Sequence, residues 1–129
     1  MIQLTSGQFI VSHDGSGSDP VHSVSMITAD GRQIVHSHGG QSGSSTGQCY
    51  YPNHLAVDSS ECVLVADSNN HRVKLLSPTL TYIRDVVTCD LLKWEPDRLC
   101  LDKQSHRLYV VENECKSGEW TGRVLVFSV

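Results

Sequence analysis

His36 and His38, two residues of a type that binds metal ions, are separated by one serine. This spacing places both imidazoles on one side of an extended strand, as a metal site would require. No third ligand stands nearby, and the pair runs into a segment rich in glycine and serine. We therefore expect exposed histidines and no bound metal.

The segment from Gly39 to Gly47 is rich in glycine, as phosphate-binding loops are. It lacks the Gly-Lys-Ser/Thr sequence of a P-loop, and no helical pattern follows it. We expect a flexible linker here, with no nucleotide and no other cofactor.

Two carboxylates that could act as a catalytic pair, Asp58 and Asp102, occupy equivalent positions after two similar apolar runs. A repeated Asp after a strand is typical of a turn closed by Asx hydrogen bonds. The chain also lacks the His-Glu-x-x-His motif of zinc hydrolases. We therefore expect a protein that is not an enzyme.

Basic and aromatic residues could bind RNA, because Trp94 and Trp120 have Lys93 and Lys116 nearby and the chain has six arginines. Glutamates surround both tryptophans, however, and the net charge is −4. Phosphate binding depends on clustered Lys and Arg, so RNA binding is the weaker alternative.

Composition indicates a folded domain, with 39% hydrophobic and 19% charged residues among 129. No signal peptide is recognisable at the start, and no apolar run approaches the roughly 20 residues of a membrane span. The odd number of cysteines and the absence of Cys-x-x-Cys favour reduced, mostly buried thiols in a cytoplasmic protein. The five are Cys49, Cys62, Cys89, Cys100 and Cys115.

The elements that position these residues are short apolar runs separated by Asn, Asp, Ser and Pro. From Tyr51 onward they cover residues 55–57, 62–66, 72–76 and 81–87, a pattern that predicts an antiparallel meander. The same pattern recurs near the end of the chain. The matched segments are 52–58 with 96–102, 63–67 with 108–112, and 72–77 with 123–128.

The N-terminal third fits the pattern more loosely, with strands expected at 2–4, 9–13, 23–27 and 33–35. Four-stranded units repeated every ~40–50 residues indicate β-propeller blades, and no helical periodicity is present. We predict an all-β fold, a partial β-propeller of about three four-stranded antiparallel blades. The predicted units are 1–50 (a degenerate blade plus a Gly/Ser inter-blade linker), 51–94 (the best match) and 95–129 (a repeat lacking its last strand).

Residues 52–73, PNHLAVDSSECVLVADSNNHRV, resemble the NHL repeat, a propeller repeat of the C-terminal domain of tripartite-motif (TRIM-NHL) proteins. The resemblance is close over 51–85, good over 95–129 and weak over 1–40. It implies an acid and an arginine flanking the turn between the second and third strands. Asp67 with Arg72 and Glu112 with Arg123 fit this pattern as intra-blade salt bridges, whereas His13 and Ser23 replace the pair in the first unit.

The resemblance also implies a closed ring of about six blades, of which this chain supplies at most three. The chain is a fragment of a longer protein, or two copies pair head-to-tail, or the three units form an open sheet. Other blades, from the same parent chain or a second copy, are needed to close a ring.

Loops on one rim of a rigid scaffold commonly carry function, and three long or unusual segments gather on one rim of the predicted blades. They are residues 14–22, 36–51 and 113–122, the first and last being lengthened forms of the turn at 68–71. The candidate interaction rim consists of Tyr50, Tyr51, His54, Asn70, His71, Lys116 and Trp120.

These observations favour a non-catalytic scaffold whose rim binds a protein. The resemblance implies that it recruits substrates for a ubiquitin ligase, although the RING and B-box domains required for transfer are absent from these residues. One alternative is an RNA-binding NHL propeller. Another is part of a propeller enzyme resembling a lactonase or lyase, which would need convergent carboxylates or histidines from several blades.

Overall fold

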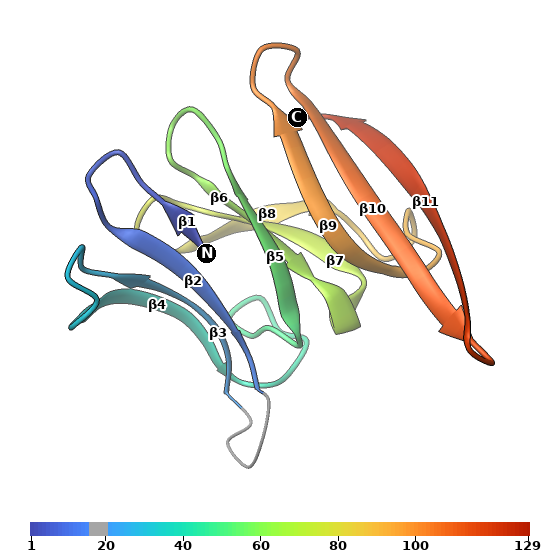
Figure 1. Cartoon of the computed structure of the whole chain (residues 1–129), viewed down its shortest axis with the longest axis horizontal. Coiled ribbons are helices and arrows are strands. Elements are labelled where there is room, and N and C mark those ends of the chain that lie inside the picture. The colour runs from blue at the N-terminus through green and yellow to red at the C-terminus, as the bar shows by residue number, and fades with distance from the viewer. Residues whose placement is uncertain (16–20) are drawn as a thin grey trace.

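The computed structural model describes residues 1–15 and 21–129, and it is built from β-strands arranged in three antiparallel sheets (Figure 1). The first sheet has the order β1-β2-β3-β4, the second β5-β6-β7-β8 and the third β11-β10-β9. The predicted all-β fold, a partial β-propeller of antiparallel sheets, is confirmed. The strands are β1 (Ile2–Gln3), β2 (Phe9–Asp14), β3 (Val21–Ile27), β4 (Ile34–Gln41), β5 (Pro52–Val57), β6 (Val63–Asp67), β7 (Arg72–Leu76), β8 (Tyr82–Val87), β9 (Glu95–Asp102), β10 (Arg107–Lys116) and β11 (Glu119–Ser128).

The second sheet lies between the other two, and alternating side chains of its strands enter two different cores. In β6, Val63 and Val65 pack toward the first sheet, whereas Leu64 and Ala66 pack toward the third. This two-sided burial explains why β6 is a continuous apolar run. Each such buried side chain contributes about 1.5–3 kcal/mol of transfer free energy.

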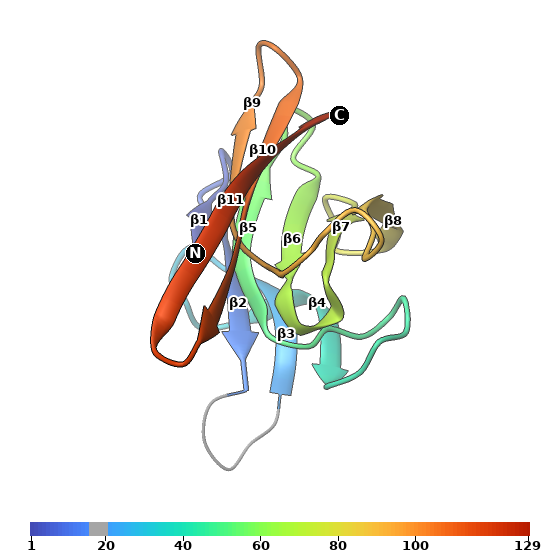
Figure 2. The ribbon, with the colours of Figure 1, turned by 90° about the vertical axis from the view of Figure 1, so that its right-hand side faces the viewer.

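The first strands of neighbouring sheets lie close together, with β5 in contact with both β1 and β9. Figure 2 shows β1, β5 and β9 in the same region of the molecule, with β4 and β8 farther out. Turns therefore collect at two opposite edges. We call one of them the loop edge, defined by the β4–β5 link (residues 42–51), the β6–β7 turn (residues 68–71) and the β10–β11 turn (residues 117–118), at the bottom of Figure 1.

Two of the predicted loops are wrong. Residues 36–41 belong to β4, where His38 and Gly40 pair with Val24 and His22. Residues 113–122 form the end of a β10–β11 hairpin that stays in register to Lys116 and Glu119. Cross-strand hydrogen bonding therefore overrides the weak strand propensity of these segments. Of the third predicted loop, residues 14–22, positions 16–20 lie outside the described residues, and Asp14, Val21 and His22 lie in strands.

The burial of the thiols also differs from the expectation that most of them are buried. All five cysteines are free, but Cys49 alone is buried; Cys62 is half-buried, and Cys89, Cys100 and Cys115 are exposed. The exposed thiols lie near turns or on strands at the surface, which the apolar character of cysteine does not predict. In the described part of the chain, no helix has the length and apolarity that a membrane span needs.

Candidate functional site

The second sheet contains a cluster of buried polar side chains, Asp67, Asn70, Arg72 and Lys74, which we call the polar centre. Its first component is an acid–arginine pair. Asp67 ends β6 and Arg72 begins β7, and the two residues are cross-strand partners. The Arg72 Nε donates to Asp67 Oδ2 at 2.8 Å, and the carboxylate is fully buried. Asn70 also donates to Asp67 Oδ2, at 2.9 Å. The ion pair expected from the repeat pattern is therefore present.

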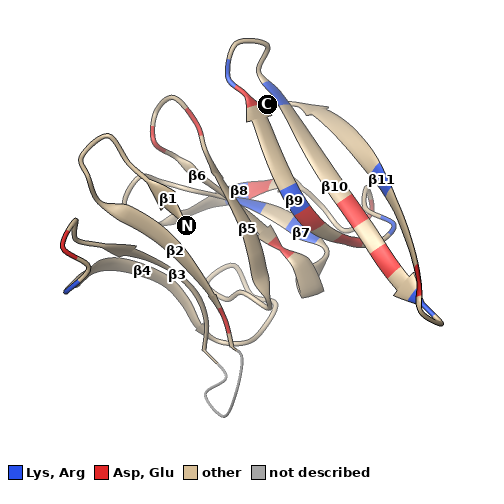
Figure 3. Cartoon of the chain, viewed as in Figure 1, with Lys and Arg blue, Asp and Glu red and all other residues tan. Residues whose placement is uncertain are grey.

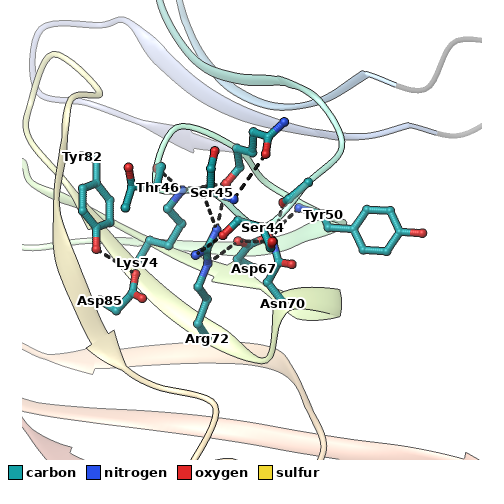
Figure 4. Close-up of polar contacts among 12 residues, drawn as sticks. Ser44, Ser45, Thr46, Tyr50, Asp67, Asn70, Arg72, Lys74, Tyr82 and Asp85 are labelled. Carbon is teal, nitrogen blue, oxygen red and sulfur yellow. Dashed lines mark hydrogen bonds and ion pairs between the residues drawn. The ribbon is translucent and has the colours of Figure 1, made fainter.

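The guanidinium of Arg72 extends from this pair into the β4–β5 link (Figure 4). It donates to the carbonyl oxygens of Ser44 and Ser45 at 3.0 and 2.9 Å, and to that of Gln48 at 3.0 Å. A planar group with several fixed donors suits this task, because one side chain can satisfy several carbonyls at once. The link is thereby fastened to the second sheet.

Lys74, two residues further along β7, is fully buried on the same face of the sheet. Its Nζ lies 2.8 Å from each of three acceptors, the Thr46 and Gln48 carbonyl oxygens and His38 Nε2. Burial lowers the pKa of this ammonium. Burial and the neighbouring Lys74 lower the pKa of His38 to about 4, so the imidazole is neutral and accepts a hydrogen bond from the ammonium.

These contacts overturn two expectations for the Gly/Ser segment. It does link the first two sheets, but Arg72, Lys74 and Asn70 bind its carbonyl oxygens, including that of Gly43. It is therefore a fastened loop and not the flexible linker predicted from composition. His38 is likewise a buried partner of Lys74 and not an exposed histidine. Among the described residues, no group of three or more His, Cys, Asp or Glu could hold a metal ion.

The fastened loop carries Tyr50 and Tyr51 to the loop edge. Tyr50 N donates to Asp67 Oδ1 at 2.7 Å, and Tyr51 N donates to His22 Nδ1 at 3.0 Å. Tyr51 has a φ of 55°, a left-handed conformation that is costly for a bulky residue. The two phenol rings and the His22 imidazole contact one another, with ring centroids 4.9–5.5 Å apart. The structure thus holds two partly exposed aromatic rings in place.

The third sheet repeats this arrangement with Glu112 and Arg123. They are cross-strand partners that form an ion pair, and the glutamate is fully buried. Glu112 Oε2 accepts hydrogen bonds from the backbone N–H groups of Lys93 and Trp94 at 2.9 and 3.0 Å. In both sheets the acid of the pair therefore binds the backbone that leads into the first strand. In the first sheet the equivalent cross-strand partners are His13 and Ser23.

The other repeated acids, Asp58 and Asp102, close turns as expected. Asp58 Oδ1 accepts from the N–H groups of Ser60 and Cys62 at 2.8 and 2.9 Å. Asp102 Oδ1 accepts from the Gln104 N–H at 3.0 Å. The turns that they close, between β5 and β6 and between β9 and β10, lie at the edge opposite the loop edge (Figure 1).

The rim residues predicted from the sequence are placed in three different ways. His54 joins two sheets, since its Nδ1 accepts from the Leu99 N–H at 3.1 Å, and burial lowers its pKa. Asn70 belongs to the polar centre, where its side-chain amide donates to the Gly43 carbonyl oxygen and to Asp67 Oδ2. Lys116 projects into solvent beside Glu114, with 3.4 Å between Nζ and Oε1.

His71 and Trp120 lie on the walls of one surface depression. It has a volume of about 540 Å³ and extends from the β6–β7 turn to the β10–β11 hairpin. We call this feature the tryptophan depression. Its lining residues are His71, Lys93, Trp94, Glu95, Asp97, Asn113, Glu114, Cys115 and Trp120.

Several residues of this region were not singled out by sequence reasoning. Lys74 and His22 lie inside strands, where one polar residue among apolar ones gives little sign of its partners. The signal available for Lys74 was its period-two spacing from Arg72 and Leu76, which places all three on one face. The contacts with the β4–β5 link depend on the packing of two sheets and could not be read from spacing.

Residues 50–74 match the model of the NHL repeat. The match spans β5 and β6 and includes Tyr50, Tyr51, Asp67, Arg72 and Lys74. No curated protein matches the chain. The predicted NHL repeat is confirmed for this segment, and the link to tripartite-motif proteins stays a prediction.

Proposed function

We propose that this NHL-containing assembly of sheets is a non-catalytic scaffold that binds a protein through its loop edge. The observation that carries the proposal is the exposure of large aromatic side chains on backbone that buried polar groups hold in place. The exposed fractions are 38% for Tyr50, 42% for Tyr51 and 71% for Trp120. Tyrosine and tryptophan are enriched at the energetic centres of protein interfaces.

The rigidity of the loop supports the same function. Ordering a flexible loop on binding costs free energy, which a fastened loop does not lose. The Tyr50 and Tyr51 backbones are fixed by Asp67 and His22, and the preceding residues are fixed by Arg72 and Lys74. A partner would therefore meet rings that are already positioned.

The use of the titratable groups supports a non-catalytic role. His38 and His54 accept hydrogen bonds inside the structure, and the carboxylates of Asp67 and Glu112 are saturated by arginine and backbone donors. A general base has to reach the proton that it abstracts, and these groups are occupied elsewhere.

RNA binding is supported less well. Arg72 and Lys74 are buried and hold backbone carbonyls, and Arg123 is paired with Glu112. Figure 3 shows acidic and basic residues mixed along the third sheet and few charges on the first. A phosphate-binding surface requires clustered free cations.

The proposal extends to the parent protein. In a tripartite-motif context, this scaffold would recruit substrates for a cytoplasmic ubiquitin ligase. Transfer of ubiquitin would depend on RING and B-box zinc domains, and in the residues described no cluster of zinc-binding side chains is present.

Quantitative affinity purification with matched variants tests the proposal. One variant combines Tyr51→Gly with Trp120→Ala; glycine accepts the positive φ of position 51, so the ring is removed without added strain. The control combines Ser60→Ala with Gln104→Ala in turns at the opposite edge. We expect the loop-edge variant to lose the proteins that wild type and control both retain. Equal recovery by all three forms, or recovery that ribonuclease abolishes, would overturn the proposal.

A further inference from the structure

The tryptophan depression has the shape of a receptor for one side chain of a partner. It lies at the loop edge, between the β6–β7 turn and the β10–β11 hairpin, and two indole rings form part of its wall. His71, which bounds it on the side of the second sheet, follows a 3-10 turn and has a φ of 50°. The depression therefore spans the second and third sheets. Its shape depends on how these two sheets pack against each other.

The charge of the lining is negative. Glu95, Asp97 and Glu114 contribute three carboxylates, against the single ammonium of Lys93. A concave surface lined by one sign of charge attracts groups of the opposite sign.

The three carboxylates differ in how many hydrogen bonds and ion pairs they form within the chain. Asp97 accepts hydrogen bonds from Asn53 and Asn113, at 2.6 and 3.3 Å. Glu114 has the exposed ammonium of Lys116 3.4 Å away, a surface contact of little energy. The Glu95 carboxylate forms no hydrogen bond or ion pair with any of the residues that the structure describes, although the residue itself pairs with Asn113 in the sheet.

One indole of the depression already binds cations of this chain. Lys93 Nζ lies 4.7 Å from the centroid of the Trp94 ring, and Arg123 Cζ lies 6.0 Å from it. Such contacts are favourable because a cation is attracted to the face of the ring. Trp120 has no such contact with a described lysine or arginine, and 71% of its surface is exposed.

We propose that the tryptophan depression binds an arginine side chain of the protein partner, with the guanidinium stacked on Trp120 and paired with Glu114, beside the carboxylate of Glu95. Arginine fits better than lysine, because a planar guanidinium can stack on an indole and donate to a carboxylate at the same time. Nucleic acid fits poorly, because the carboxylates repel phosphates. The inference rests on the proposed function and specifies the chemistry of the partner at that edge.

The test titrates the full chain with two labelled peptides, acetyl-Gly-Arg-Gly-Arg-Gly-amide and the same peptide with citrulline in place of arginine. Citrulline keeps the planar shape of arginine, has a carbonyl oxygen in place of one NH2 group of the guanidinium, and carries no charge. We expect saturable binding of the arginine peptide below about 1 mM, and binding of the citrulline peptide at least about tenfold weaker. Glu114→Gln should weaken arginine-peptide binding about fivefold, whereas Glu61→Gln, the same charge change at the opposite edge, should leave it unchanged.

Equal affinity for the two peptides, or equal effects of Glu114→Gln and Glu61→Gln, would overturn the inference. The absence of saturable binding below that concentration would overturn it as well. These outcomes are distinguishable from failure of the proposed function, which is read from the single variant Tyr51→Gly purified beside the double variant, because Tyr51 lies outside the lining of the tryptophan depression. Retention of partners by Glu114→Gln with their loss in Tyr51→Gly would leave the scaffold proposal standing and remove the arginine site.

Discussion

At Lys74 the chain buries an ammonium completely and surrounds it with acceptors. Two of these are carbonyl oxygens of the β4–β5 link, and the third is the neutral imidazole of His38. The Tyr82 ring adds a cation–π contact, with its centroid 5.4 Å from Nζ. A buried charge is tolerated only when it is paired or well hydrogen-bonded, as it is here. Lys74 thus connects the first sheet, the link and the second sheet.

Replacement of Lys74 by Met should destabilise the protein by about 1–3 kcal/mol, because it leaves the Thr46 carbonyl and the His38 acceptor without their donor. Lys103→Met, at an exposed turn, should change the stability by less than about 0.5 kcal/mol. Urea unfolding followed by fluorescence measures both variants. A Lys74→Met protein as stable as wild type would show that the ammonium contributes no net stability.

Stability should decrease in mild acid because of His38. Its pKa is about 4 in the folded protein, against the ordinary 6.5, so between these values the unfolded chain binds a proton that the folded chain does not. The contribution of His38 is therefore present above pH 6.5 and is lost as the pH falls toward 4. His54, whose pKa is also lowered, acts in the same direction. Urea unfolding at several pH values between about 7 and 4.5 measures the slope.

His38→Gln provides the matched comparison, since its side-chain oxygen accepts a hydrogen bond from Lys74 and does not titrate. This variant should lose less stability than wild type over the same pH range. Identical pH profiles would contradict the assignment of the titration to His38.

At the residue scale, the repeat pattern predicted the two ion pairs and the two Asx turns correctly. Asp67 with Arg72 and Glu112 with Arg123 stand at matching positions of two similar segments, which is sufficient to pair them. The partners of Lys74 could not be predicted, because they come from 26 to 36 residues away through the packing of sheets. The composition of the Gly/Ser segment suggested a flexible linker, but Arg72 and Lys74 bind its backbone carbonyl oxygens, which composition does not reveal.

At the element scale, the β10–β11 hairpin determines where Trp120 lies. Its turn has two residues, Ser117 and Gly118, with φ values of 52° and 81°. Two positive φ angles in succession are required by the hairpin turn that matches the twist of antiparallel strands. The ten-residue strands on either side keep their register up to this turn.

Gly118→Val should therefore lower stability by about 1–3 kcal/mol and weaken binding at the tryptophan depression, because a β-branched residue is strained at a φ of 81°. Ser117→Asn is the control, since Asn tolerates the left-handed conformation and should leave both properties unchanged. Thermal unfolding and peptide titration measure the two effects. A Gly118→Val protein with unaltered stability would contradict the turn geometry.

The apolar runs were sufficient to predict most strands, because two-sided burial requires continuous apolar residues, as in β6. The ends of β4 and β10 were missed for the same physical reason. Their sequences, His-Ser-His-Gly-Gly and Glu-Asn-Glu-Cys-Lys, have no apolar pattern, and it is the pairing with neighbouring strands that makes them extended.

At the scale of the whole molecule, β11 exposes two apolar side chains on its outward surface. Val124 and Val126 of β11 are 58% and 54% exposed, and within the described chain β11 pairs only with β10. An exposed apolar strand at the edge of a sheet favours association.

We therefore expect concentration-dependent self-association, which sedimentation velocity measures. The double variant Val124→Thr with Val126→Thr should shift the distribution toward the monomer while keeping the β-branched shape of both residues. Ile83→Thr, at an exposed apolar residue of β8, is the matched control and should have little effect. Unchanged association in the double variant would exclude this surface as its cause.

The sequence repeat predicted that the chain forms a succession of antiparallel sheets, as it does. It did not predict that the loop edge carries two separate features, the cluster of Tyr50, Tyr51 and His22 and the tryptophan depression. The first depends on the hydrogen bonds that hold the β4–β5 link, and the second depends on the length of the β10–β11 hairpin. We expect a protein partner to bind at this edge.

Hydrogen exchange of the chain, with and without a partner recovered by affinity purification, tests that claim most directly. We expect slower exchange on binding in residues 44–51 and 114–121, and unchanged exchange in the turns around Ser60 and Gln104. Slower exchange confined to those opposite turns, or to the outward surface of β11, would contradict it.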